Sequence, residues 1–158
     1  MLTKNLLITF LFFTLLSCGH PAEIQLQEKF QANKTDFIEL VQMLEQDKDI
    51  VTLTKNNIFY EEGNSQKISA ERLSEYRKLL DKLELKSGIH RGGPVISIPI
   101  SVKGFPFESS SMGYAYSPSE LSPIVSSLDQ IIQNDPGDTS LKFEELSTPN
   151  WYLSYESW

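Results

Sequence analysis

Apolar residues recur along this 158-residue chain at the spacing of helices in some segments and of strands in others. Two stripes follow the helical spacing of three and four residues. The first consists of Phe37, Leu40, Val41 and Leu44, and the second of Leu73, Tyr76, Leu79, Leu80 and Leu83. Side chains at this spacing share one side of a helix, so each stripe predicts an amphipathic helix that packs on a core. Thr35 and Ser69 are the expected N-caps.

A third helix is expected after residue 121. Ser122 is placed to cap it, and Pro123 suits the first helical position because the amide hydrogen that proline lacks has no partner there. The expected core stripe consists of Ile124, Val125, Leu128, Ile131 and Ile132.

Strict alternation of apolar and polar residues marks a strand between residues 95 and 103. Its apolar positions are Ile96, Ile98, Ile100 and Val102. Successive side chains of a strand point to opposite faces, so one face of this strand is expected to be buried. Pro99 cannot donate to a strand ladder, which predicts an edge position or a bulge. Further strands are expected at 50–54, 58–60, 113–117, 141–146 and 151–155, whereas His90 and Ser109 to Ser111 are expected in loops.

Helix and hairpin therefore alternate three times along the chain. This order predicts an α+β fold with a single domain over residues 29–158. We expect an antiparallel sheet of about six short strands, with one face packed against three helices.

The N-terminus differs from the rest of the chain. Lys4 precedes a largely apolar run from Leu6 to Leu16, in which Thr9 and Thr14 are the polar residues. A positive charge followed by 7–15 apolar residues is typical of an export signal, and this run is too short to cross a bilayer about 30 Å thick.

The end of that run, Leu15-Leu16-Ser17-Cys18, resembles the lipobox of bacterial lipoprotein precursors. The resemblance implies that residues 1–17 are removed and that Cys18 is acylated, with residues 18–28 as a tether between lipid and domain. Cys18 is the single cysteine, which fits a thiol used by the lipid rather than by a disulfide. Gly19 stands where an aspartate would favour the inner membrane, so the implied location is the outer membrane, facing the periplasm.

Charge restricts the partners of the exported domain. The chain carries a net charge of −7, and removal of Lys4 with the signal makes it −8. An acidic surface repels nucleic acid, so none is expected, and the membrane contact is expected through the lipid on Cys18. Residues 67–91 hold seven basic and four acidic residues, whereas residues 92–158 hold two basic and eight acidic ones. The exposed side of a solvated helix accounts for the basic segment. The alternative is an acidic face that steers a basic protein partner.

Candidate chemistry is sparse. The chain has two histidines, His20 in the tether and His90, and no serine stands in a nucleophile-elbow motif. One histidine in the domain does not make a zinc site. We therefore expect no catalytic residues, no metal and no cofactor, and we do not expect an enzyme.

Aromatic residues of the last third are the better candidates. Trp151, Leu153 and Tyr155 share one strand face and are expected in the core. Tyr152 points the other way, and with Tyr114 and Tyr116 it is the expected partner-binding surface, since tyrosine is enriched in binding hot spots.

The segments Gly113–Ser117 and Trp151–Leu153 are similar to segments of small bacterial proteins without an assigned activity, and this resemblance implies no functional residues. The expected function is protein binding by a monomer, as an inhibitor or immunity-type protein or as an accessory subunit of an envelope machine. An envelope-acting hydrolase and a small-ligand carrier are the alternatives.

Overall fold

The computed structural model describes residues 20–63, 67–105, 108–134 and 140–158. The helices in these residues are α1 (Glu23–Ala32), α2 (Lys34–Gln46), α3 (Ala70–Lys82) and α4 (Leu128–Asn134). The strands are β1 (Ile50–Leu53), β2 (Ile58–Tyr60), β3 (Ile89–Gly92), β4 (Val95–Phe105), β5 (Glu108–Tyr116), β6 (Lys142–Glu145) and β7 (Trp151–Ser157). No helix in this part of the chain is both long and apolar enough to cross a membrane.

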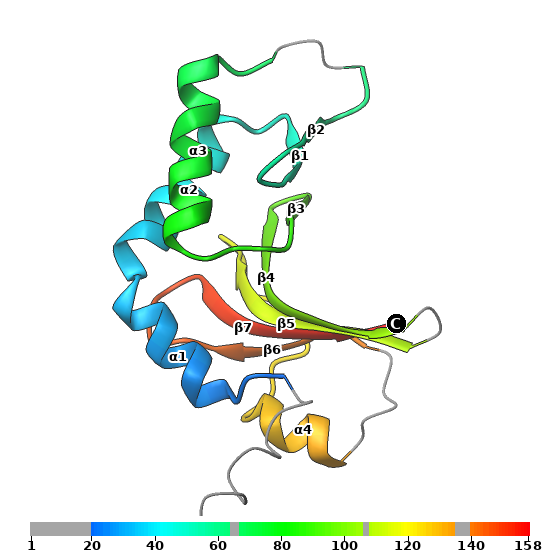
Figure 1. The fold of residues 1–158 in the computed structure, drawn as a ribbon. Helices are drawn as coiled ribbons and strands as arrows, with labels where there is room; N and C mark the ends of the chain where they lie inside the picture. Colours follow the sequence, from blue (N-terminus) through cyan, green and yellow to red (C-terminus); the bar gives the residue numbers. More distant parts are fainter. Residues whose placement is uncertain (1–19, 64–66, 106–107, 135–139) are drawn as a thin grey trace, which may run out of the picture.

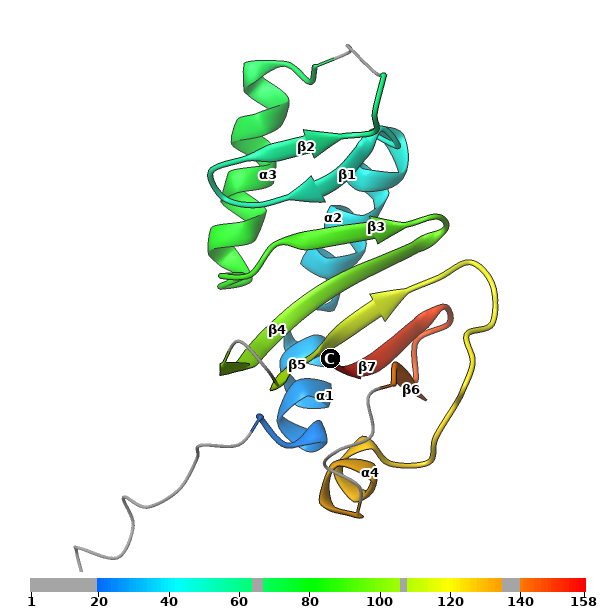
Figure 2. The same ribbon diagram turned by 90° about the vertical axis from the view of Figure 1, so that its right-hand side faces the viewer.

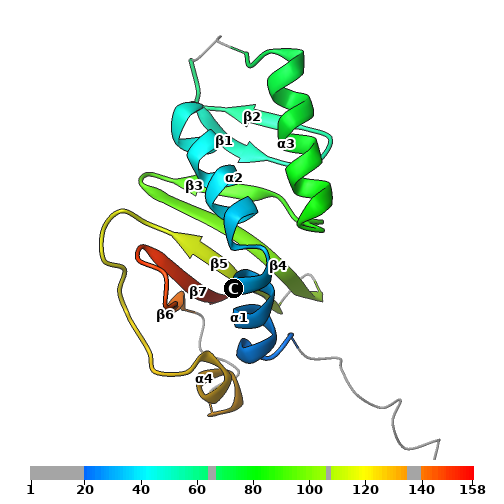
Figure 3. The same cartoon turned by 90° about the vertical axis from the view of Figure 1, so that its left-hand side faces the viewer.

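All seven strands form one antiparallel sheet in the order β2-β1-β3-β4-β5-β7-β6. Helices α1, α2 and α3 lie along one side of this sheet (Figure 1). Viewed from the helices, α2 and α3 cover the half with β1 and β2, and α1 covers the half with β5 and β7 (Figure 3). The predicted α+β class with a single domain is confirmed, with one helix and one strand more than expected.

The core lies between the helices and the sheet. Phe30 of α1 and Phe37 of α2 stack with ring centroids 5.5 Å apart. Tyr114 of β5 packs against Phe37 at 4.8 Å, and Trp151 of β7 packs against Phe30 at 4.9 Å. Aromatic contacts at these distances bury large apolar areas. The two sequence stripes supply much of the remaining core, including Leu40, Leu44, Tyr76 and Leu80.

The globular domain begins earlier than predicted. Residues Glu23 to Glu28, assigned to the tether on sequence, form the first turns of α1, and Leu26 is buried in the core. Leu26 and Phe30 are four residues apart and share the inner side of α1. The tether over residues 18–28 is therefore shorter than expected.

The third helix was predicted to start too early. Helix α4 begins at Leu128, and the segment before it pairs with the edge strand β6. The amide of Phe143 donates to the carbonyl of Pro123 (3.1 Å), and the amide of Val125 donates to the carbonyl of Phe143 (2.8 Å). These bonds keep residues 123–125 extended, so their apolar side chains follow a strand geometry.

Two segments expected as loops are strands. Residues around His90 form β3, in which Ile89 is buried. Gly93 lies in the tight turn into β4, with a φ of +60°, a backbone conformation that few other residues adopt. Ser109 to Ser111 belong to β5. The bulge expected at Pro99 is confirmed by a register shift between Pro99 and Ser101, beyond the last pair of β4 with β3.

The second face of the sheet carries no helix over β2, β1, β3 and β4 (Figure 2). On this side, the segment after β5 folds back over part of the sheet. Its Leu121 packs on a small cluster of Ala115, Phe143 and Tyr152. The segment therefore covers this face around Ala115 of β5, Tyr152 of β7 and Phe143 of β6.

Candidate functional site

Two of the three predicted tyrosines face the helices. Tyr114 is fully buried, and its hydroxyl donates a hydrogen bond to the carbonyl of Leu26 (2.8 Å). Burial raises the pKa of Tyr114 well above its ordinary value. Tyr116 is half-buried against Trp151, at a ring distance of 5.6 Å. Both residues belong to the core side of β5.

Tyr152 points away from the helices, as its strand position predicts, but it is only 6% exposed. It packs against Phe143 with ring centroids 6.1 Å apart, in the cluster that Leu121 covers. The three tyrosines predicted as a partner-binding surface, Tyr114, Tyr116 and Tyr152, therefore do not form one, because Tyr114 and Tyr152 are buried on opposite faces of the sheet and Tyr116 is half-buried on the core side.

A different surface is available to a partner. Register pairs Phe59 with Thr52, Thr52 with His90, and His90 with Ser97, so these four side chains form one row across β2, β1, β3 and β4. We call this row and the neighbouring outward positions the open face. It consists of Thr52, Phe59, His90, Ser97, Pro99, Val102, Ser111 and Glu156.

The open face combines a small, polar centre with apolar ends. Near its centre, the Oγ1 of Thr52 lies 3.2 Å from the Nδ1 of His90. Phe59 is 57% exposed at one end, and Val102 is 51% exposed on β4. Each of these side chains offers a partner an apolar contact at one end of a polar row.

The charge of the open face is negative. Glu156 is exposed within it, and the exposed Glu145 lies at its border, in the row that continues through Tyr152. Among the strand residues that the structure describes, none of those pointing to this side is a lysine or an arginine. Arg91 points to the other side, where it binds Glu45 (2.8 Å). A basic partner would therefore meet no cation on these strands.

Sequence reasoning did not bring Phe59 and His90 together on one face of the sheet. The alternation in Ile58-Phe59-Tyr60 does place Phe59 opposite its buried neighbours, but only the register with β1 reveals which face is open. His90 gave no signal because β3 was not recognised as a strand.

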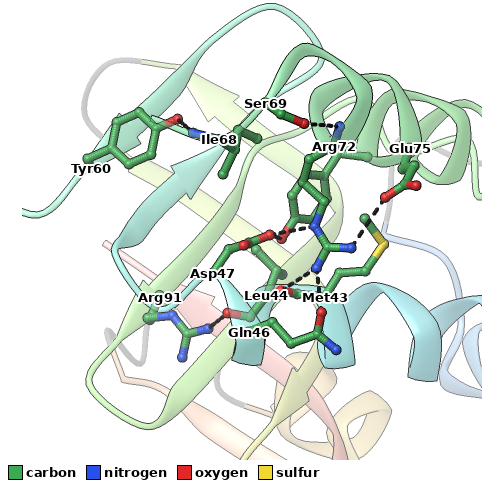
Figure 4. Close-up of polar contacts among 11 residues, drawn as sticks. Met43, Leu44, Gln46, Asp47, Tyr60, Ile68, Ser69, Arg72, Glu75 and Arg91 are labelled. Carbon is green, nitrogen blue, oxygen red and sulfur yellow. Dashed lines mark hydrogen bonds and ion pairs between the residues drawn. The ribbon is translucent and has the colours of Figure 1, made fainter. Parts of the chain in front are cut away.

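A second polar cluster has a structural role (Figure 4). Arg72, near the start of α3, donates to Asp47 (2.7 Å) and Gln46 (2.9 Å) at the end of α2. The hydroxyl of Tyr76 donates to the same Asp47 oxygen (2.7 Å). A hollow of about 290 Å³ adjoins this cluster. Since the guanidinium already has partners on α2, the cluster ties α3 to α2 and leaves little of Arg72 for a ligand.

A third polar cluster joins the N-termini of α1 and α4. Glu144 of β6 is buried and accepts bonds from the amide of Leu128 and the side chain of Gln27, both at 3.0 Å. Glu23 accepts from Ser127 (3.0 Å), and its own amide donates to Asp129 (3.2 Å). Carboxylates in these places satisfy helix amides that would otherwise lack partners.

Burial raises the pKa of Glu144, and the neighbouring Glu23 carboxylate raises it further. Although burial acts in the opposite direction, hydrogen bonds from the amide of Asp129 and from neighbouring side chains lower the pKa of Glu23. Within the described ranges, no group of three or more histidine, cysteine or acidic side chains is arranged to hold a metal ion.

Comparison with protein-family models, curated proteins and solved structures found no match to this chain. Cys18 and the signal-like segment before it lie outside the described residues, so lipid attachment stays a prediction.

Proposed function

We propose that this protein is a lipid-anchored binding protein of the bacterial envelope, held in the outer membrane by acylated Cys18 and exposed to the periplasm. It binds a basic protein partner as a monomer, through the open face of its sheet. The lipobox-like sequence before Cys18 supports the anchor. The open face supports the binding role and is the observation on which the proposal depends.

The chemistry of the open face suits a protein partner. Phe59 offers a large, rigid apolar group, which is the type of side chain that dominates binding energy at interfaces. Glu145 and Glu156 favour basic groups opposite them, and complementary charge speeds association. Inhibition of a lytic enzyme or toxin and assembly of an envelope machine both use such a surface, and the identity of the partner decides between them.

Site-directed photo-crosslinking tests this proposal. Acylation of Cys18 leaves the protein without a free thiol, so an introduced cysteine is a unique point of attachment for a thiol-reactive benzophenone. The variants are His90→Cys on the open face and the matched control Lys78→Cys, an exposed position on α3. In isolated envelopes, position 90 should give a discrete protein adduct that position 78 does not give.

The partner found in this way is then tested in pure form. Phe59→Ser should raise its off-rate with little change in the stability of the free protein, because Phe59 is mostly exposed. The on-rate should rise as ionic strength falls and the screening length increases from about 8 Å at 0.15 M to about 30 Å at 0.01 M. Equal adducts from both positions, or an off-rate unaffected by Phe59→Ser, would count against the open face as the binding surface.

A further inference from the structure

The start of the described chain is docked on the sheet through His20. Its Nδ1 lies 3.1 Å from the Oγ of Ser101 in β4, and its Nε2 lies 2.7 Å from the Oγ of Ser110 in β5. The ring also meets Tyr155 of β7 edge-on, at a centroid distance of 5.9 Å. Both ring nitrogens are therefore used, and three strands fix the position of one side chain.

This contact limits how far from the sheet the lipid attachment point can lie. Cys18 precedes His20 by two residues, and two residues of extended chain span at most about 7 Å. If Cys18 is acylated, as the proposed function requires, the acyl chains leave the protein within that distance of the docked backbone. The membrane surface must then lie beside the part of the sheet that holds Ser101 and Ser110.

The same end of the sheet exposes a tryptophan. Trp158 is 55% exposed, and its backbone amide and carbonyl each bond to Ser109 at 2.8 Å, one residue before Ser110. Tryptophan is favoured at the boundary between lipid headgroups and acyl chains, where its ring is buried and its N–H stays hydrated.

We infer that the end of the β4–β5 strand pair, with Trp158, rests on the lipid bilayer, and that His20 holds the domain in this orientation. The inference rests on the proposed acylation of Cys18 and adds to it a defined membrane-facing end. Because β2 is at the far edge of the sheet, Phe59 stays away from the bilayer and remains available to a partner.

Tryptophan fluorescence in lipid vesicles tests the inference. The chain has two tryptophans, and the other, Trp151, is buried in the core at 3% exposure. The acylated protein is purified from membranes and reconstituted into phosphatidylethanolamine–phosphatidylglycerol vesicles, with and without brominated acyl chains. We expect bromine to quench the wild-type emission. The variant Trp158→Phe, in which only Trp151 emits, should show no quenching.

Docking by His20 is tested with the double variant Ser101→Ala/Ser110→Ala, which leaves the signal and the lipobox-like sequence unchanged. Loss of both hydroxyl partners should shift the docking equilibrium by about 10- to 100-fold and reduce the quenching of Trp158. The matched control is Ser111→Ala, a neighbouring serine on the opposite face of β5, which should be quenched like the wild type.

Acylated wild-type protein whose Trp158 is not quenched would overturn this inference and leave the proposed anchor intact. Quenching that persists unchanged in the double serine variant would overturn the role of His20. Protein without acyl chains on Cys18 would contradict the proposed anchor itself, and this inference with it.

Discussion

Gly113 lies where β4 and β5 approach too closely for any side chain. A Cβ atom at this position would stand 2.3 Å from the carbonyl oxygen of Ile98 and 2.8 Å from the Cα of Pro99. This close approach coincides with the bulge that follows Pro99, where the backbone of β4 lies close to that of β5. A glycine here is thus a requirement of the bulged sheet.

Gly113→Ala is accordingly expected to destabilise the protein by about 1–3 kcal/mol, as overpacking does elsewhere. The matched control is Gly92→Ala, because a Cβ atom at Gly92 meets no other atom within 4 Å. That variant should be neutral or slightly more stable, since alanine reduces the entropy of the unfolded chain. Urea denaturation of both variants measures the difference, and equal midpoints would contradict the bulge geometry.

Tyr114 and Tyr152 offer a second comparison of single residues. Tyr114→Phe removes the buried hydroxyl that bonds to Leu26 and should cost about 1 kcal/mol of stability. Tyr152→Phe should cost less than Tyr114→Phe, because its ring packs mainly on Phe143 and Ala115. Guanidinium denaturation curves monitored by circular dichroism give the ranking. The opposite order would mean that the hydroxyl of Tyr114 is not a structural bond.

For single residues, the sequence predicted the direction of side chains better than their exposure to solvent. Alternation correctly set Tyr152 opposite Trp151 and Leu153. It did not predict burial of Tyr152, because that depends on Leu121, which is 31 positions earlier in the chain and reaches the sheet only through tertiary folding.

Helix α3 is the element that the sequence predicted best. Ser69 caps it by accepting from the amide of Arg72 (3.1 Å), and Tyr76, Leu79 and Leu80 form its buried side. Leu80→Ala should destabilise the protein by about 2–5 kcal/mol through a core cavity, whereas the exposed Lys78→Ala should change stability by less than about 0.5 kcal/mol. Thermal or urea unfolding compares the two, and a reversed order would contradict the orientation of α3.

Element boundaries were harder to predict where side chains of distant segments set them. Helix α4 starts at Leu128 because Glu144 and Glu23 bind its first amides, while the backbone of Phe143 keeps residues 123–125 extended. Neither interaction follows from local spacing. The proline that suits a helix start also suits an extended edge, so Pro123 did not decide between them.

The junction of α1 and α4 should respond to pH. Because the pKa of Glu144 is raised in the fold, this group contributes stability that is present below its unfolded pKa of about 4.5 and is lost as pH rises through its folded pKa. Glu144→Gln removes that titration. The stability of the variant relative to wild type should therefore increase between pH 4.5 and pH 7.

The control for this experiment is Glu145→Gln, a change at the exposed neighbouring carboxylate, which should alter stability by less than about 0.5 kcal/mol at each pH. Urea midpoints at several pH values measure both variants. If the stability of Glu144→Gln relative to wild type stays constant or falls as pH rises, burial does not disfavour the charged form of Glu144.

Over the whole molecule, we propose different partners for two regions of the sheet. The end near His20 and Trp158 is assigned to the membrane, and the row from Phe59 to Ser97 is assigned to a protein. The sequence predicted the α+β class, because periodicity is a local property of the chain. It did not predict the open face, because the order of seven strands and the path of residues 117–127 are set by tertiary packing.

The membrane assignment depends on an acyl anchor at Cys18, and metabolic labelling with a radioactive fatty acid tests that anchor most directly. The wild-type protein, expressed in bacteria and recovered from the outer-membrane fraction, should carry the label. The Cys18→Ser variant should remain unlabelled and keep residues 1–17. An unlabelled wild-type protein, or equal labelling of the two proteins, would contradict the account.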